Sequence, residues 1–232
     1  MPGPVSGQFP NRNIFYSSYI ASYIERDVRN LSDSIDALKF NRFVTAAAAR
    51  CSQLLNYNAL AEDAEIDVLT AKSWLNILET LGIVFLLHPY SNNVLKRTIK
   101  TPKLYFFDTG LVCYLTRWSS PEVAEEGAMS GALLENYAIS EIMKSYQNAG
   151  QEPYLYFYRD RDAKEIDAIL EKDGKLCPLE IKKTAMPDQR LTRVFKVIDK
   201  SPLSVGTGAI LCMADHFSAI DRDNLIIPIW MI

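Results

Sequence analysis

The stretch Glu165–Lys183, EIDAILEKDGKLCPLEIKK, predicts two adjacent β-strands joined by a tight turn. Apolar residues alternate with polar ones over 165–171 and again over 175–183, and side chains in a strand point alternately to its two faces. The KDG between these runs is a signal for a β-hairpin. The stretch therefore indicates a hairpin that carries charged side chains along otherwise apolar strands.

Strict alternation gathers three of these charges on one side of the sheet. In the first strand it places Asp167 on the face opposite to Ile166 and Ala168. In the second strand it places Glu180 and Lys182 on one shared face. Because the two strands are neighbours, the hairpin is expected to present Asp167, Glu180 and Lys182 together.

These residue types suit metal-dependent phosphodiester chemistry. Two carboxylates at close range bind Mg²⁺ or Mn²⁺, with waters completing the coordination. We therefore take Asp167 and Glu180 as candidate metal ligands and Lys182 as the residue that positions the attacking water. Glu135, near the apolar stripe of an expected helix, is a candidate assisting acid. The plain alternative is a solvated strand face with paired charges, on a fold without activity.

The hairpin lies inside a longer α-β-β-β-α-β-β pattern. A helix is expected over 130–150, with Ser130 as its cap and Gly150 as its stop. A strand is expected over 154–160, a second helix over 188–200, and closing strands over 208–213 and 224–231. This order predicts an α/β sandwich on a mixed sheet.

The first half of the chain indicates a winged helix-turn-helix. Helices are expected over 17–31 and 41–56, then a short helix over 59–64 capped by Asn58, then a longer helix that Gly82 stops. Strands over 83–90 and 103–108 would form the wing. The predicted organisation is a disordered tail over 1–13, a helical and winged helix-turn-helix domain over 14–118, and the α/β domain over 119–232.

Composition and charge give the general class of protein. Hydrophobic residues make up 48% and charged residues 23% of the 232 residues, which is typical of globular proteins, and the net charge of -3 provides no global basic field. A local basic cluster, Lys96, Arg97, Lys100 and Lys103, lies in the first half. The candidate nucleic-acid contacts are Lys72 at the start of the longer helix and Lys96, Arg97 and Lys100 in the wing. A protein-interaction or interdomain module is the alternative for this half.

The cysteines and the hydropathy pattern concern the compartment. The four cysteines form no CxxC pair, so a zinc site is not expected, and scattered single cysteines favour buried thiols in a reducing cytoplasm. No apolar run reaches the roughly 18 residues that a membrane span needs. The sequence therefore predicts a cytoplasmic protein that does not span a membrane.

Several stretches together resemble one family. They are YIERDVR (23–29), KLYFFDTGLVCYL (103–115), GALLENYAISEI (131–142), YFYRDRDAKEIDAIL (156–170), PLEIKK (178–183) and IIPIWMI (226–232). Through them the chain resembles the domain of unknown function that follows the core of prokaryotic P-loop (AAA-type) ATPases. The resemblance covers nearly everything after the first dozen residues. It implies a winged helix followed by a nuclease-like domain of the PD-(D/E)XK superfamily, inside a larger ATP-hydrolysing protein.

One departure from that family is large. No GxxxxGK[ST] motif occurs in the chain, so ATP belongs to the parent family and is not expected to bind here. The first functional expectation is a metal-dependent nuclease-like module acting on nucleic acid, with DNA preferred over RNA. The second is a non-catalytic module that binds DNA or protein for an upstream or separate ATPase. The sequence gives no oligomeric state.

Overall fold

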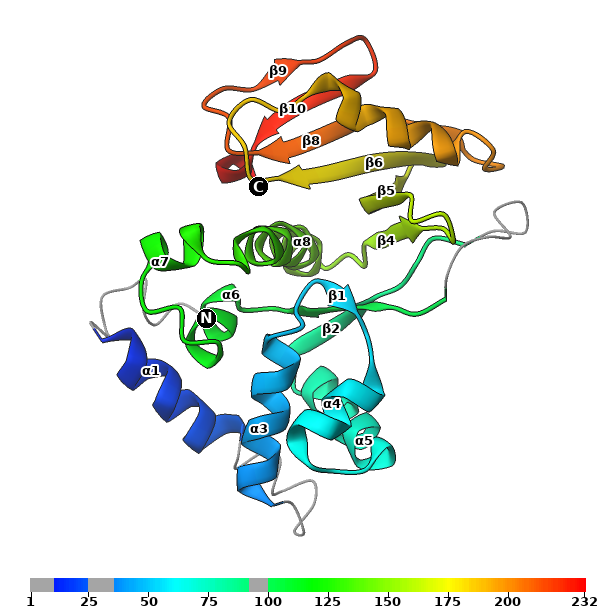
Figure 1. Cartoon of the computed structure of the whole chain (residues 1–232). Helices are drawn as coiled ribbons and strands as arrows, with labels where there is room; N and C mark the ends of the chain where they lie inside the picture. The colour runs from blue at the N-terminus through cyan, green and yellow to red at the C-terminus, as the bar shows by residue number, and fades with distance from the viewer. Residues whose placement is uncertain (1–10, 25–35, 92–99) are drawn as a thin grey trace. The chain divides into compact units, whose positions relative to one another are not determined.

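The computed structural model describes residues 11–24, 36–91 and 100–232, and these fall into two compact units (Figure 1). Unit 1 takes its residues from Met1–Cys51, Leu55–Phe85 and Phe106–Gly127. Unit 2 takes its residues from Ser52–Leu54, Leu86–Tyr105 and Ala128–Ile232. Mixed helix and strand content with two separate sheets makes the fold class α+β.

Unit 1 is helical. Its elements are α1 (Arg12–Tyr19), the π-helical turn η1 (Ile20–Ile24), α3 (Ala37–Ala48), α4 (Tyr57–Ala64), α5 (Val68–Thr80), α6 (Thr109–Leu115) and α7 (Pro121–Glu126). Its core contains an aromatic group in which the rings of Phe40 and Phe43 on α3 meet the Trp74 ring on α5 edge to face. Such contacts add to the free energy gained by burying the rings.

A three-stranded sheet follows the order β1-β3-β2, formed by β1 (Gln53–Leu54), β3 (Lys103–Phe106) and β2 (Val84–Leu87). The expected helix over 41–56 is wrong in its second half, because α3 ends at Ala48 and β1 follows. Ser52 leaves the helical region with φ +61°, and its N–H donates to the carbonyl of Leu104 at 2.7 Å. Pairing with β3 therefore overrides the local helix propensity.

Side-chain caps and one left-handed residue define the turn between α4 and α5. Asn56, and not Asn58 as expected, caps α4 by accepting from the Ala59 N–H at 3.1 Å. At the other end Glu65 adopts φ +53°, and the Ile66 N–H returns to the Ala61 carbonyl, which closes the helix. Asp67 then caps α5 through the Thr70 N–H.

The Asn56→Ala variant is expected to lower the free energy of unfolding by about 1 kcal/mol, the usual cost of losing a helix N-cap. The matched control is Asn58→Ala, because Asn58 is exposed within α4 and is expected to change stability by less than about 0.5 kcal/mol. Urea denaturation followed by circular dichroism measures both. Equal losses in the two variants would show that the cap is misassigned.

Unit 2 is built on a seven-stranded mixed sheet. Its strands are β4 (Tyr154–Arg159), β5 (Glu165–Lys172), β6 (Lys175–Lys182), β7 (Ser204–Val205), β8 (Gly208–Cys212), β9 (Ser218–Ala219) and β10 (Asn224–Pro228). The order is β4-β5-β6-β8-β10-β9, with β7 beside β6. Pairing is antiparallel from β4 to β6, parallel from β6 through β8 to β10, and antiparallel between β10 and β9.

Helical segments cover this sheet. The helix α8 (Ser130–Asn148) packs on β6, and η2 (Gln189–Ile198) packs on β5, β6 and β8 (Figure 1). The helix expected over 188–200 is a 3₁₀-helix, and Ser130 is the first residue of α8 and not its cap, which is Met129. A short 3₁₀ turn, η3 (Ile229–Met231), follows β10. The predicted hairpin is confirmed, with Asp173 and Gly174 at φ +52° and +71° as a type I′ turn requires.

Candidate functional site

A β-bulge places Asp167. Across the β4–β5 pair, Tyr158 lies opposite Ile166 and Tyr156 lies opposite Ile169, so one residue of β4 faces the two residues Asp167 and Ala168. Ile166 and Ile169 consequently belong to the same buried cluster. The strict alternation expected from the sequence is therefore wrong at this point of β5. Bulges re-aim a side chain without ending the strand, and they are common beside active sites.

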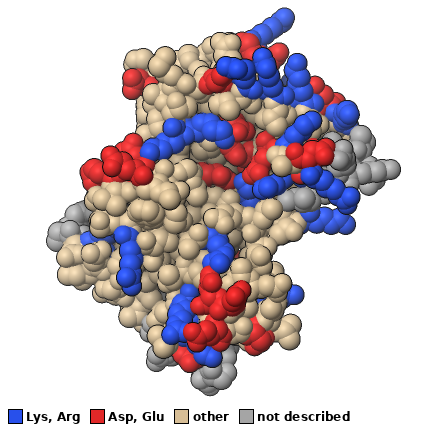
Figure 2. Space-filling model, viewed as in Figure 1, with Lys and Arg blue, Asp and Glu red and all other residues tan. Residues whose placement is uncertain are grey.

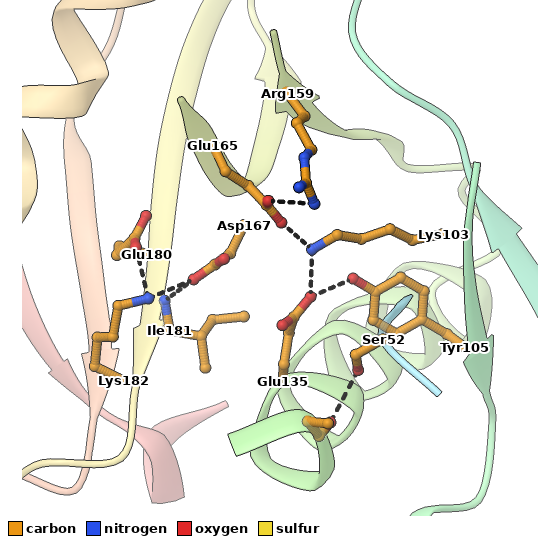
Figure 3. Close-up of polar contacts among 11 residues, drawn as sticks. Ser52, Lys103, Tyr105, Glu135, Arg159, Glu165, Asp167, Glu180, Ile181 and Lys182 are labelled. Atoms are coloured by element: carbon orange, nitrogen blue, oxygen red, sulfur yellow. Dashed lines mark hydrogen bonds and ion pairs between the residues drawn. The ribbon is translucent and has the colours of Figure 1, made fainter. Parts of the chain in front are cut away.

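Asp167, Glu180 and Lys182 meet in unit 2 (Figure 3). Asp167 Oδ2 accepts from the backbone N–H of Ile181 at 2.8 Å and from Lys182 Nζ at 3.2 Å. The same Nζ lies 2.6 Å from Glu180 Oε1. One ammonium group thus joins two carboxylates from neighbouring strands.

Glu180 is the member of this group whose hydrogen bonding is incomplete. The residue is only 7% exposed, and its Oε2 has no hydrogen-bond partner among the residues that the structure describes. Burial, followed by the nearby Asp167 charge, raises the pKa of Glu180 to about 7, although Lys182 acts in the opposite direction. A buried carboxylate oxygen without a partner is costly and is suited to binding a cation.

Lys182 remains a cation in this setting. Burial acts to lower the pKa of Lys182, but the charges of Asp167 and Glu180 outweigh burial and raise it above the usual value. Two ionised carboxylates and one ammonium carry a net charge of -1. The group can therefore accept further positive charge.

Glu135 lies in a neighbouring network, where its partners in the described part of the chain are Lys103 and Tyr105. Its Oε1 accepts from Lys103 Nζ at 2.9 Å and from the Tyr105 hydroxyl at 2.6 Å (Figure 3). Burial raises the pKa of Glu135. The positive charge of Lys103 acts to lower this pKa, and the negative charge of Asp167 acts to raise it further. Glu135 therefore influences the Asp167 group through its charge, while Lys103 and Tyr105 hold its side chain.

Sequence reasoning missed three members of this network, Lys103, Glu165 and Arg159. Lys103 Nζ lies 2.5 Å from Glu165 Oε1, and Arg159 pairs with Glu165 Oε2 at 3.1 Å. The sequence analysis placed Lys103 in a local basic cluster, and in the structure this residue is only 3% exposed. The available signal was the apolar run LYFF directly after it, which indicates a strand buried on both faces.

The predicted nucleic-acid contacts lie elsewhere on the chain. Lys72 is exposed on α5, with its Nζ 5.5 Å from the centre of the Tyr57 ring, and Lys100 is exposed. Lys96 and Arg97 lie outside the described residues. Sequence reasoning also missed a set of exposed basic residues over 189–200, the segment that begins with η2. They are Arg190, Arg193, Lys196 and Lys200. Figure 2 shows basic side chains gathered on unit 2.

The donor set limits what metal could bind. In the described ranges 11–24, 36–91 and 100–232, no group of three or more His, Cys, Asp or Glu side chains is placed to hold a metal ion. Mg²⁺ commonly binds through one or two carboxylates and keeps several waters. The hard oxygen donors of Asp167 and Glu180, with the unpartnered Glu180 Oε2, fit an ion of that kind.

The remaining features concern thiols and membranes. All four cysteines are free, with Cys51 and Cys212 buried and Cys113 and Cys177 partly buried. None of the helices in the described residues has both the length and the apolar character needed to cross a bilayer.

Comparisons with known proteins find that this chain is similar to mycobacterial proteins. It is 30% identical over 210 residues to Uncharacterized protein Rv2008c of Mycobacterium tuberculosis and to Uncharacterized protein Mb2031c of Mycobacterium bovis. The aligned region is 90% of this chain and 46% of each relative, so the chain spans about half the length of these curated relatives. No solved structure matches the chain.

Two family models match successive parts of the sequence. The model described as Domain of unknown function (DUF4143) matches residues 130–232, which contain the Asp167 group. The second model matches residues 1–122, more than half of the 232 residues. The chain therefore belongs to the family described as Domain of unknown function (DUF8612).

Proposed function

We propose that residues 119–232 form a PD-(D/E)XK nuclease-like domain that hydrolyses phosphodiester bonds of nucleic acid with Mg²⁺ or Mn²⁺. The observation that carries the proposal is the contact of the partly exposed Lys182 with two buried acids, Asp167 and Glu180, in which Glu180 Oε2 has no partner among the described residues. The α8-β4-β5-β6-η2-β8-β10 order around this group supports it.

Each residue of the group has a role in this proposal. Asp167 and Glu180 hold the ion, which when bound supplies a water of lowered pKa and shields phosphate charge. Lys182 donates hydrogen bonds from Nζ, which orients the attacking water and stabilises developing negative charge. Glu135 assists through its charge, since its Oε1 is engaged by Lys103 and Tyr105.

Unit 1 and the short sheet supply binding in the same proposal. The order α3-β1-α4-α5-β2-β3, with β3 between β1 and β2, supports a winged helix-turn-helix. We propose that this part binds DNA, in preference to RNA, through Lys72 and the wing. We further propose that the chain works within, or together with, a P-loop ATPase, as the family resemblance implies.

A second function is favoured by one observation. Lys182 already contacts both carboxylates, and within the described ranges the group contains these two carboxylates alone. A domain that kept the fold but lost its chemistry would also pair these charges internally. The alternative is therefore a non-catalytic module that binds DNA or a partner protein for an ATPase.

The test is cleavage of labelled DNA and RNA, single-stranded and duplex, in Mn²⁺. We expect cleavage by the wild type and a rate lowered at least about 100-fold in Asp167→Asn, which keeps the shape of the side chain but removes its charge. The matched control is Asp173→Asn, the same substitution in the exposed turn of the same hairpin, which is expected to cleave normally. Binding of nucleic acid without cleavage of any substrate would replace this proposal with the non-catalytic module.

A further inference from the structure

Lys103 is a buried cation held between two acids. Its side chain is 4% exposed, its Nζ lies 2.9 Å from Glu135 Oε1 and 2.5 Å from Glu165 Oε1, and it sits 5.4 Å from the centre of the Phe157 ring. Removing an ammonium group from water is costly unless several partners replace its hydration. Here the carboxylates of Glu135 and Glu165 (Figure 3) and the face of the Phe157 ring do so.

The group around Lys103 and the group around Lys182 differ in net charge. In the first group the acids Glu135 and Glu165 face the cations Lys103 and Arg159, so the charges cancel. In the second group Asp167 and Glu180 face Lys182 alone, which leaves one negative charge when both acids are ionised. Of these two groups, the second therefore carries a negative charge that an additional cation would neutralise.

We infer that the Lys103 ammonium takes the place of a second metal ion between Glu135 and Glu165, so that the domain binds one divalent cation and not two. The inference rests on the proposed function, because it concerns the metal content of that site. Glu135 and Glu165 offer the hard oxygen ligands that Mg²⁺ and Mn²⁺ prefer, but the ammonium already occupies the space between them. Lys103 is accordingly a positioning residue that sets the number of ions.

The experiment is a calorimetric Mn²⁺ titration of the wild type, Lys103→Met and Lys103→Arg, with thermal unfolding measured in parallel. Methionine keeps an unbranched apolar stem like that of lysine as far as Cε, and it lacks the ammonium group. We expect one Mn²⁺ in the wild type and in Lys103→Arg, and two in Lys103→Met. Because ligands of the native state raise stability, Mn²⁺ is expected to raise the Tm of Lys103→Met by more than that of the wild type.

A double variant assigns the second ion. Lys103→Met/Glu135→Gln removes the cation and one of its two acids, so it is expected to return to one Mn²⁺. If Lys103→Met folds only when Mn²⁺ is present, the metal replaces the ammonium and the inference holds. A Lys103→Met protein that binds a single Mn²⁺ as the wild type does, or that Mn²⁺ does not rescue from unfolding, would overturn the inference.

The outcomes separate this inference from the proposed function. Absence of Mn²⁺ binding by the wild type contradicts the metal-dependent function. If Lys103→Met then gains one ion that Glu135→Gln abolishes, the ammonium still takes the place of an ion between Glu135 and Glu165, and the count of one ion in the wild type fails together with the proposed function. One ion in both wild type and Lys103→Met leaves the proposed function intact and removes the inference.

Discussion

The Glu180→Gln variant is expected to be more stable than the wild type at pH 8 by about 2–3 kcal/mol and to lose much of the pH dependence of stability between pH 5 and 8. Burial raises the pKa of Glu180 from its usual 4.5 to about 7. The folded state therefore holds more protons than the unfolded state between these values. The free energy of unfolding therefore falls as the pH rises from 4.5 to about 7, where the buried side chain becomes charged.

Glutamine mimics the protonated acid and never acquires this charge. Its amide oxygen still accepts from Lys182, so the contact at Oε1 is kept. Urea denaturation at pH 5, 6.5 and 8 measures the effect, with Glu152→Gln as an exposed control that is expected to follow the wild type. A weaker slope of the same sign is expected to remain, because burial also raises the pKa of Glu135. An unchanged slope in Glu180→Gln would contradict the assignment of this titration.

The Phe43→Ala variant is expected to lower the free energy of unfolding of unit 1 by about 3–5 kcal/mol. Phe43 is fully buried, and its ring centre lies 5.6 Å from that of Trp74 at an interplanar angle of 75°. Alanine removes both the burial and this edge-to-face contact, and it leaves a cavity that a packed core fills only partly.

Chemical denaturation followed by tryptophan fluorescence measures the loss, since Trp74 reports directly on the site of the change. The matched control is Leu38→Ala on the same helix, because Leu38 is 64% exposed and is expected to change stability by less than about 0.5 kcal/mol. A loss below about 1 kcal/mol in Phe43→Ala would contradict the packing of α3 against α5.

The elements that the sequence predicts well are those in which local and tertiary preferences agree. The β5–β6 hairpin has alternating apolar residues and a KDG turn whose Asp173 and Gly174 adopt positive φ without strain elsewhere. Helix α5 is also predicted well, because Asp67 supplies its N-cap and its apolar face is continuous. Such segments need little information from distant parts of the chain.

The elements that were missed depend on distant partners. The stretch 49–56 follows a run of alanines and favours helix locally, but Ser52 and β1 pair with β3, about fifty residues away. No local signal marks the bulge at Asp167, which arises from the register between β4 and β5. Tertiary pairing decides both cases, and a single sequence does not display it.

In the candidate site, too, the residues that are close in sequence could be predicted and the distant ones could not. Asp167, Glu180 and Lys182 could be selected because their spacing on a hairpin is visible in the sequence, and the structure brings their polar atoms together. The network of Lys103, Glu165 and Arg159 could not be selected from the sequence, because β3 lies about sixty residues before β5 in the chain. An isolated lysine in a sequence indicates solvent exposure unless its acidic partners are known.

Calorimetric titration of Mn²⁺ into the wild type and into Asp167→Asn tests the metal-dependent site most directly. The metal site predicts one binding event in the wild type that is weakened at least about 100-fold in the variant, together with an affinity that rises up to about tenfold per pH unit below pH 7 as Glu180 loses its proton. Absence of binding by the wild type, or equal binding by both proteins, would contradict a metal site at Asp167 and Glu180.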